Sequence, residues 1–441
     1  MKKNNYSSSR RKLIKMALGA GVLSAIPLPL LLLAAPIKTK GHIVIIGDGA
    51  AGLAMANRLR YRFTGNKITL IGARMHHYYQ PGYTMIASGL WKKESVISQT
   101  ADWLPQGIDW IAKNAKFVSG ATKTVTLADG QSIKYDALVV ATGCQLNFHQ
   151  IEGLEYNQLG TQGIGSVYVS PQIALQTSQQ IDFWLAKRKG RGIFTLPDTS
   201  LKCAGAPLKM TFTTLSRIER LSHSDHLEVD FFTPYKDRIF SVPLYNRFVT
   251  ERWQQQGVHV HYQNVLKGID AFAKKAYFRK PDGALKSEHY DFIHIVPPMS
   301  APDAILQSDL VWQEGPYAKD WLEVDPFTLQ HRRFPEVFGI GDVAGIPLGK
   351  TAASVKLQAP VVEANLISYL TGRTMTARYN GYTSCPLITA IGKAILAEFG
   401  YGNVLLPSFS FIDPTKESWA VWVMEEQMLH PAYNAMLLGK V

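Results

Sequence analysis

Cysteine is scarce in this sequence. The 441 residues contain only Cys144, Cys203 and Cys385, and no two of them have the close spacing of a metal knuckle. So few cysteines exclude a disulfide-stabilised scaffold, and no cluster of His, Cys, Asp or Glu in the sequence indicates a metal site. Composition alone is consistent with three buried thiols, so any role for them has to come from their local sequences.

Basic runs interleaved with aromatic residues are absent too, as is zinc-finger spacing, which argues against nucleic-acid binding. Charged residues make up 18% of the chain and hydrophobic residues 46%, which favours a globular fold over disorder. The length exceeds one ordinary core and predicts two or three domains. The net charge is +13, with six positive charges in residues 1–35, and the +7 that remains suits an anionic membrane surface or substrate.

The segment 1–35 contains no Asp or Glu. Its basic stretch, Ser9–Lys15, precedes an apolar run that begins at Met16 and is about long enough to span a bilayer. This order is typical of an export signal, and the pair Arg10-Arg11 followed by Leu-Ile-Lys resembles a bacterial twin-arginine signal. We therefore expect export to the periplasmic side of the bacterial inner membrane, as a peripheral or N-terminally anchored protein. Whether the signal is cleaved stays open.

A glycine-rich turn follows the first predicted strand, Gly41–Ile46, and leads into a helix that ends near Arg60 and a second strand, Lys67–Ile71. This is the setting in which GxGxxG binds a dinucleotide. The first glycine allows the tight turn, the second lets the backbone approach the pyrophosphate, and the third lets helix and strand pack closely. The predicted cofactor-binding residues here are Gly47, Gly49, Ala50, Ala51 and Gly52.

The second strand lacks the acidic residue expected at its end. An Asp or Glu there normally binds the ribose hydroxyls, but the corresponding position is Gly72. The ribose contact must be absent or supplied by another residue. Arg74 could favour additional phosphate, which is the weaker alternative.

Two further segments resemble parts of the two-dinucleotide-binding-domain flavoprotein family. Tyr135–Gly143 is an apolar strand that ends in Ala-Thr-Gly, and Val337–Asp342 is another that ends in Gly-Asp. Both occur in the family's order after the glycine turn. The resemblance implies FAD as cofactor, with the Asp342 carboxylate bonded to its ribitol. It adds to the predicted FAD-binding residues Ala141, Thr142, Gly143, Gly341 and Asp342.

The second nucleotide-binding turn of that family has lost its glycines in this chain. The predicted strand 191–197 is followed by Asp-Thr-Ser-Leu-Lys-Cys-Ala-Gly-Ala-Pro instead of GxGxxG, which argues against NAD(P)H as electron donor. Cys203 stands in this turn, before a helix predicted over 209–220. A helix N-terminus and the neighbouring Lys202 both stabilise a thiolate. The sequence suggests that electrons enter through a thiol.

Cys385 lies in a similar turn-like segment, Gly381–Leu387, where Pro386 is suited to begin a helix. Together with Lys202–Pro207, this segment resembles the two cysteine motifs of sulfide:quinone oxidoreductases, especially the mitochondrial-type branch. The likeness covers roughly residues 41–441. Further similar stretches are His77–Pro81, Val296–Ser300, Thr328–Arg333 and Lys350–Ala353.

The resemblance implies a mechanism. Cys203 and Cys385 would form a redox-active pair on one face of FAD, where sulfide attacks one sulfur and leaves a persulfide. A sulfane sulfur acceptor or a growing polysulfide would clear the site, and a membrane quinone would take two electrons from the flavin. Which cysteine is attacked first stays open. Cys144 matches no motif of the family and is interpreted as a buried thiol.

Other residues carry weaker hypotheses. Lys350 is predicted to stabilise negative charge on the reduced flavin, with a solvent-facing lysine as the alternative. Lys393 and Glu398 are candidates for the surroundings of the quinone. The tail, residues 415–441, alternates apolar and aromatic side chains with acidic ones. It is predicted to form amphipathic helices in the membrane interface, or else to pack on the core or in a homo-oligomer interface.

We therefore expect an α/β protein with two Rossmann-like domains and C-terminal membrane-interface helices. The predicted parts are a signal or anchor (1–35), a split FAD-binding domain (40–150 and 315–380), a second Rossmann-like domain carrying Cys203 (151–314) and a C-terminal region carrying Cys385 (381–441). Three alternatives stay open. They are a flavocytochrome-type sulfide dehydrogenase that reduces cytochrome c, a type II NADH dehydrogenase-like quinone reductase, and a flavin-binding partner protein without catalysis.

Overall fold

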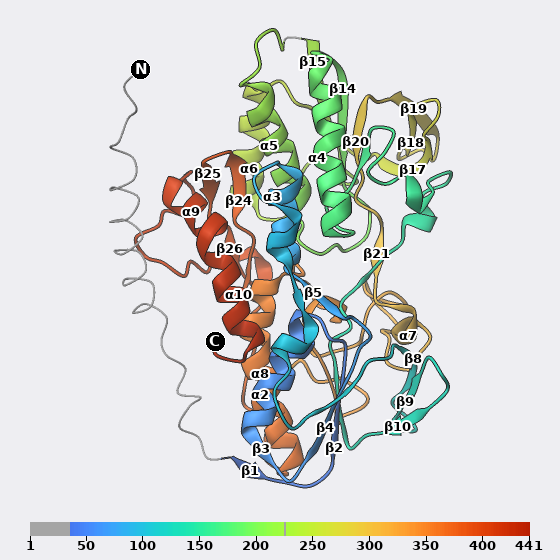
Figure 1. The fold of residues 1–441 in the computed structure, drawn as a ribbon, viewed down its shortest axis with the longest axis vertical. Coiled ribbons are helices and arrows are strands. Elements are labelled where there is room, and N and C mark those ends of the chain that lie inside the picture. The colour runs from blue at the N-terminus through green and yellow to red at the C-terminus, as the bar shows by residue number, and fades with distance from the viewer. Residues whose placement is uncertain (1–35, 225) are drawn as a thin grey trace.

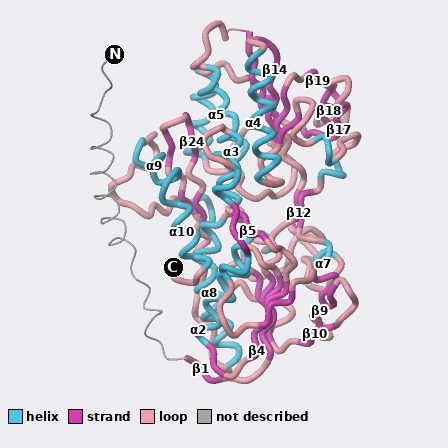
Figure 2. The backbone as a smooth tube through the Cα atoms, viewed as in Figure 1, coloured by secondary structure: helices cyan, strands magenta, loops and turns pink. Residues whose placement is uncertain are grey.

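The computed structural model describes residues 36–224 and 226–441, which form two α/β lobes, one above the other in Figure 1. Each lobe is built on a five-stranded parallel sheet. A short antiparallel pair, β12 (Gln145–Leu146) and β21 (Met299–Ser300), lies where the chain passes between the lobes (Figure 2). The predicted segment 1–35 lies outside the described residues.

Four of the five strands in the lower sheet are almost wholly buried and mostly apolar, and one edge strand is partly exposed. Parallel strands covered on both faces need such continuous apolar sequence, because neither face meets water. Its order is β22 (Val337–Gly339), β11 (Ala137–Val140), β2 (His42–Ile46), β4 (Lys67–Ile71) and β7 (Asp109–Ile111). Helices α2 (Ala50–Arg62) and α8 (Ala352–Leu370) pack against each other beside this sheet. β22 therefore lies beside β11 although the whole upper lobe separates them in sequence.

The upper lobe repeats this plan. Its parallel sheet has the order β13 (Ile164–Gly165), β20 (Phe292–His294), β14 (Lys189–Thr195), β15 (His226–Phe232) and β16 (His259–His261). The helices of this lobe are α4 (Pro171–Ala186), α5 (Ala206–Ile218) and α6 (Pro243–Gln255). Helix α5 begins three residues before the predicted start, because Pro207 suits the first turn of a helix.

Each lobe also carries a three-stranded antiparallel sheet on one side. In the lower lobe its strands are β8 (Ala115–Ser119), β9 (Thr124–Leu127) and β10 (Ser132–Lys134). In the upper lobe they are β17 (Val265–Asp270), β18 (Lys275–Arg279) and β19 (Leu285–His289). The remaining short elements before the C-terminal region are β1 (Ile37–Lys38), β3 (Phe63–Thr64), β5 (His76–Tyr78), β6 (Ile97–Gln99), α3 (Tyr83–Ala87) and α7 (Asp303–Leu306).

The C-terminal region runs back along both lobes (Figure 1). It contains β23 (Thr383–Ser384), β24 (Leu387–Ala390), β25 (Lys393–Ile395), β26 (Glu398–Phe399), α9 (Trp419–Val423), a π-helix (Met424–Met428) and α10 (Leu429–Leu437). Strand β24 packs on α5 of the upper lobe, and α10 packs on α2 of the lower lobe. The helix expected to begin at Pro386 is absent, because the chain there enters the β24–β25 hairpin instead.

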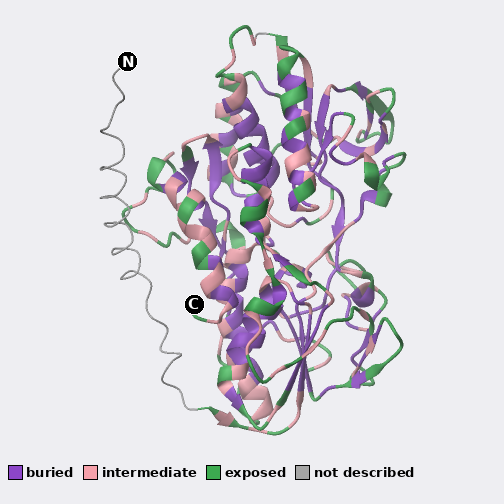
Figure 3. Cartoon of the chain, in the orientation of Figure 1, coloured by how far each residue is buried: buried purple, intermediate pink, exposed green. Residues whose placement is uncertain are grey.

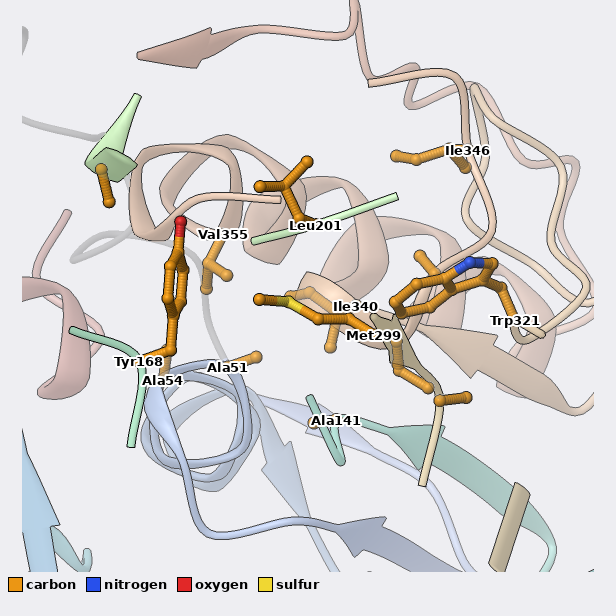
Figure 4. Packing of buried hydrophobic residues seen from close by; sticks show 14 of the residues in the cluster. Ala51, Ala54, Ala141, Tyr168, Leu201, Met299, Trp321, Ile340, Ile346 and Val355 are labelled. Carbon is orange, nitrogen blue, oxygen red and sulfur yellow. The ribbon is translucent and has the colours of Figure 1, made fainter. Parts of the chain in front are cut away.

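One large core cluster joins the two lobes. It contains residues of both parallel sheets and of the C-terminal region, and Figure 3 shows this buried interior running the length of the molecule. In Figure 4, Leu201 and Met299 lie near Val355 of α8 and near Ile340, which directly follows strand β22 of the lower sheet. None of the helices among the described residues has the length and apolar character needed to cross a membrane.

Candidate active site

The turn between β2 and α2 has the backbone shape of a dinucleotide cradle. Gly47 has a φ of +105°, and a Cβ there would lie 2.3 Å from the carbonyl oxygen of Ala141 at the end of β11. At Gly52 a Cβ would lie 1.6 Å from the carbonyl oxygen of Gly47. The helix can therefore start this close to the strand only with glycine at both positions.

The N-terminus of α2 is open at the position where a phosphate would bind. Gly49 caps the helix, and the only atom near its Cβ position is Nη1 of Arg74, at 3.6 Å. Ala50 and Ala51 form the first turn, whose N–H groups have no partner within the helix. Their small side chains and the helix dipole make this end suitable for an anion.

The third predicted segment meets the same helix. Gly341 has a φ of +78°, and a Cβ there would lie 3.2 Å from the Cβ of Ala51. Its N–H donates to Oε1 of Gln358 on α8, at 2.8 Å. Burial raises the pKa of the neighbouring Asp342 carboxyl, and the positive charges of Lys202 and Lys350 offset this only in part.

The residues at the end of β11 also fit a bound cofactor. The hydroxyl of Thr142 is buried and has no hydrogen-bond partner among the described residues. Gly143 has a φ of +70°, and a Cβ there would meet nothing within 4 Å. An unpaired buried hydroxyl beside open space is what a polar ligand would satisfy. The glycine turn and both later segments could together hold FAD, the cofactor that the sequence predicts.

Cys203 and Cys385 meet, although 182 positions separate them in the sequence. They are free thiols whose sulfur atoms lie 3.8 Å apart. A disulfide needs about 2 Å, so a small closing movement would join them. Cys385 is buried, whereas Cys203 is partly exposed. The structure therefore brings together both predicted catalytic residues.

Helix α5 places its N-terminus under the sulfur of Cys385. A Cβ at the cap residue, Gly205, would lie 2.3 Å from this Sγ. Only a glycine leaves room for so close an approach. The helix N-terminus that the sequence predicted to stabilise a thiolate on Cys203 is therefore placed to stabilise one on Cys385 as well. Sequence reasoning had given Gly205 no role, because the contact depends on a residue from the far end of the chain.

The two thiols differ in acidity. The pKa of Cys385 is lowered, first by the hydrogen bond with Cys203 and then by the positive charge of Lys209. The pKa of Cys203 is raised by the same hydrogen bond and by burial. In the reduced pair the negative charge therefore resides on Cys385, where the α5 N-terminus also favours it.

Lys209 forms a buried ion pair that the sequence had not indicated. Its Nζ lies 2.8 Å from Oε1 of Glu425 in the π-helix, and both side chains are about 5% exposed or less. Burial lowers the pKa of Lys209, but Glu425 and the two cysteines raise it by more, so the lysine stays charged. The only sequence signal was Glu425 itself, an acidic residue within an apolar tail.

Lys350 connects the cysteines to the predicted FAD-binding residues. Its carbonyl oxygen accepts a hydrogen bond of 2.8 Å from the N–H of Cys203. Its Nζ donates to the carbonyl oxygens of Asp342 and Ala344, both at 2.7 Å, and lies 3.7 Å from the ring centre of Trp321. Burial lowers the pKa of Lys350 to about 8. The alternative of a solvent-facing lysine is therefore wrong.

Three other residues that the sequence singled out have less to contribute. Burial raises the pKa of the Cys144 thiol to about 11, so it is protonated at neutral pH and is a poor nucleophile. Glu398 is buried and accepts hydrogen bonds from the hydroxyl of Tyr382 and from the N–H of Ser408. Lys393 lies at the exposed start of β25.

Comparisons with known proteins agree with this site. Residues 41–172 match the pyridine nucleotide-disulphide oxidoreductase family. The mitochondrial sulfide:quinone oxidoreductase of Dictyostelium discoideum is 33% identical, over 92% of this chain and 87% of that protein. The mitochondrial sulfide:quinone oxidoreductase of Mus musculus is 30% identical, over 98% of this chain and 94% of that protein.

The chain belongs to the sulfide:quinone oxidoreductase family. A crystal structure of the sulfide:quinone oxidoreductase from Aquifex aeolicus has the same fold, with a TM-score of 0.74 and 20% identity over 90% of this chain and 92% of that one. The predicted family and the α/β fold with two Rossmann-like sheets are thereby confirmed.

The predicted location is wrong. The relatives that share 30–33% identity over most of the chain are mitochondrial proteins, which contradicts export by a twin-arginine route to a bacterial periplasm. The residues on which that prediction depended lie outside the described part of the chain. Their composition was ambiguous, because mitochondrial targeting segments are likewise rich in Arg and Ser and poor in acidic residues.

Proposed function

We propose that this enzyme oxidises sulfide to sulfane sulfur at the Cys203–Cys385 pair and passes the electrons through FAD to a quinone. The observation that carries the proposal is the 3.8 Å approach of the two sulfurs, from distant parts of the sequence. The names of the relatives supply sulfide and quinone as substrates. The hydrogen bond from Cys203 to Lys350 connects the pair to the predicted FAD site.

The chemistry is thiol–disulfide exchange. In the oxidised pair, hydrosulfide attacks one sulfur, so that the bond between the cysteines breaks and a persulfide and a thiolate form. A sulfane sulfur acceptor then removes the outer sulfur and leaves two reduced cysteines. Their return to the disulfide releases two electrons and the thiol proton. Bound FAD supplies the two-electron acceptor that connects this oxidation to the quinone.

The surroundings of the pair favour its charged form. The α5 N-terminus at Gly205 and the charge of Lys209 both stabilise a thiolate on Cys385. The hydroxyl of Tyr168 donates a hydrogen bond of 3.1 Å to the carbonyl oxygen of Cys203 and so holds this backbone in place. A thiol of lowered pKa is the better leaving group in exchange, and the best attacking thiol is one whose pKa lies near the ambient pH.

The C-terminal region supplies the surface that we propose for the membrane and the quinone. Val404, Phe411 and Trp419 are 60%, 78% and 54% exposed. Exposed apolar and aromatic side chains close together in sequence suit a membrane interface. The side chains of Tyr433, Met436 and Leu437 on α10 are buried instead, so the last helix packs on the protein rather than on lipid. The proposed surface is therefore residues 404–419.

The test is a flavin absorbance spectrum of the purified, FAD-loaded enzyme. Sulfide should bleach the oxidised flavin in the native chain, and Cys203→Ser and Cys385→Ser should each slow the bleaching by at least about a thousandfold, because neither single thiol can form the disulfide. Decylubiquinone should restore the colour faster than cytochrome c does. Rapid bleaching by NADH, or native rates in both serine variants, would contradict the proposal.

A further inference from the structure

The ribose-binding carboxylate that the sequence lacks at Gly72 has a replacement in space. The side chain of Asp48, from within the glycine turn, lies directly against Gly72 at the end of β4. A Cβ at Gly72 would lie 2.3 Å from Cγ of Asp48 and 2.5 Å from its Oδ2. The carboxylate therefore occupies the space into which an acidic side chain at position 72 would extend.

The carboxylate of Asp48 is buried, and only one of its two oxygens makes a short contact with Arg74. The residue is 4% exposed, and its Oδ2 accepts a hydrogen bond of 2.7 Å from the N–H of Arg74. Its Oδ1 has Nε of Arg74 at 3.8 Å, beyond hydrogen-bond range. Burial raises the pKa of Asp48, and Arg74 offsets this in part. Because a buried carboxylate is costly without full hydrogen bonding, its Oδ1 is suited to accept an additional hydrogen bond from a ligand hydroxyl.

Two departures from the usual pattern thus explain each other. An aspartate stands between Gly47 and Gly49, and a glycine stands where the acidic residue is expected. Given the 2.3 Å contact, a side chain at position 72 and the present position of Asp48 exclude one another. Arg74 belongs to the same corner, since its Nη1 lies 3.6 Å from the Cβ position of Gly49. Its charge is paired with Asp48, which weakens the alternative of additional phosphate.

We propose that Asp48 is the ribose-binding residue of the FAD site. The carboxylate that usually stands at the end of the second strand is supplied here from the glycine turn. The charged oxygen accepts the hydrogen bond of the adenosine ribose hydroxyl, as an acidic residue at the strand end does in other dinucleotide folds. The inference rests on FAD as the cofactor of the proposed function, but not on sulfide oxidation.

The experiment measures FAD binding to apoprotein from which the cofactor has been removed, by quenching of flavin fluorescence. Asp48→Gly should weaken FAD binding by roughly tenfold to a hundredfold, the usual worth of hydrogen bonds to a charged group. Gly72→Glu alone should bind still less, because its side chain collides with Asp48. The double variant Asp48→Gly/Gly72→Glu restores the usual arrangement and should recover to within a few-fold of the native affinity. Native affinity in Asp48→Gly, or a double variant no better than Asp48→Gly, would overturn the proposal.

A second measurement separates ribose binding from a structural role for Asp48. The ligand is an FAD analogue whose adenosine ribose lacks the 2′-hydroxyl. The native apoprotein should bind the analogue at least about tenfold more weakly than FAD, whereas Asp48→Gly should bind both alike. An equal loss in both proteins would show that Asp48 only holds the turn. No sulfide is present in either experiment, so a failure of the sulfide chemistry cannot produce these results or conceal them.

Discussion

Two strand-to-helix turns occupy corresponding places in the two lobes and differ in what they contain. Both follow a buried parallel strand and lead into a 13-residue helix, from β2 to α2 in the lower lobe and from β14 to α5 in the upper one. The first turn keeps its glycines and leaves the helix N-terminus open. In the second, Cys203 stands in the turn and the sulfur of Cys385 lies against the helix cap. One helix end is thus suited to a phosphate and the other to a thiolate.

The comparison shows that each turn has a glycine where another atom approaches the backbone closely, although the approaching atoms differ. In the lower turn, Gly52 makes room for the carbonyl of Gly47. In the upper turn, Gly205 makes room for the sulfur of Cys385. A helix N-terminus stabilises negative charge in either case. The same strand–turn–helix unit can therefore form a nucleotide site or a thiol site, depending on which group the turn leaves room for.

The largest expected effect is in the lower turn. Gly52→Ala places a Cβ 1.6 Å from a carbonyl oxygen, so strand and helix must separate. We expect a colourless protein with a lower Tm, destabilised by about 3 kcal/mol or more as in other overpacked cores. FAD content after purification and thermal unfolding measure both effects.

The matched control is Gly49→Ala. Gly49 has a φ of −82°, which alanine adopts freely, and its Cβ has room. This variant should keep the native Tm as apoprotein and lose only FAD affinity, since the new methyl group occupies the approach to the pyrophosphate. If Gly49→Ala and Gly52→Ala lower the Tm equally, Gly49 serves the packing of the turn as Gly52 does, and it is not kept for the approach of the pyrophosphate.

The next effect is in the upper turn. Gly205 has a φ of −80°, so alanine is allowed by the backbone, but its Cβ would lie 2.3 Å from the sulfur of Cys385. Gly205→Ala should keep FAD and lose sulfide-dependent flavin reduction by roughly a hundredfold, because misplacement of reacting atoms by about 1 Å costs that much. Stopped-flow absorbance measures the rate.

A double variant shows whether this collision is the cause. Cys385→Ala removes the sulfur, so Gly205→Ala should lower the Tm of the native chain and leave that of Cys385→Ala nearly unchanged. If Gly205→Ala destabilises both proteins equally, the contact between helix cap and sulfur is not what the glycine serves.

Local patterns predicted the lower turn well and the upper turn poorly. The strand Lys67–Ile71 was predicted at its observed bounds, since buried apolar runs and glycines are readable within a short window. The contact of the two cysteines came only from a family resemblance. Gly205, Lys209 and Asp48 were missed because their partners lie elsewhere in the chain.

The error at Pro386 has the same origin. Proline after a turn suits a helix start, but it suits a strand start equally, and the hairpin packed on α5 decided between them. A short stretch of sequence shows only the secondary-structure propensity of its residues. It does not show the tertiary contact that overrides this propensity.

A smaller effect concerns charge in the upper turn. Lys209 lowers and Glu425 raises the pKa of Cys385. Lys209→Met should therefore shift thiolate formation to higher pH by about one unit, and Glu425→Gln should shift it to lower pH, because the thiolate becomes the sole anionic partner of the lysine. Thiolate ultraviolet absorbance of the reduced enzyme against pH measures this, with Cys385→Ser as baseline. The pair also interacts with Tyr79 and Tyr168, and both variants retain these tyrosines and Cys203.

The opposite signs of these shifts make the test decisive. Loss of a purely structural ion pair would loosen the site in both variants and move the titration in one direction. If both variants shift the pKa of Cys385 in the same direction, Lys209 is not the counter-charge of the thiolate.

The smallest effect is the backbone strain at Cys203. Its φ is +47°, in the left-handed region that costs non-glycine residues about 1–2 kcal/mol. The lower turn meets this demand with glycine at Gly47, whereas the upper turn must keep a thiol. Glycine relieves this strain, but it also gains conformational freedom in the unfolded chain, which cancels part of the benefit. In denaturant unfolding, Cys203→Gly should therefore be more stable than Cys203→Ala by about 1 kcal/mol. Equal stability of the two variants would mean that the thiol is held there without strain, and that the two turns differ in chemistry but not in conformational cost.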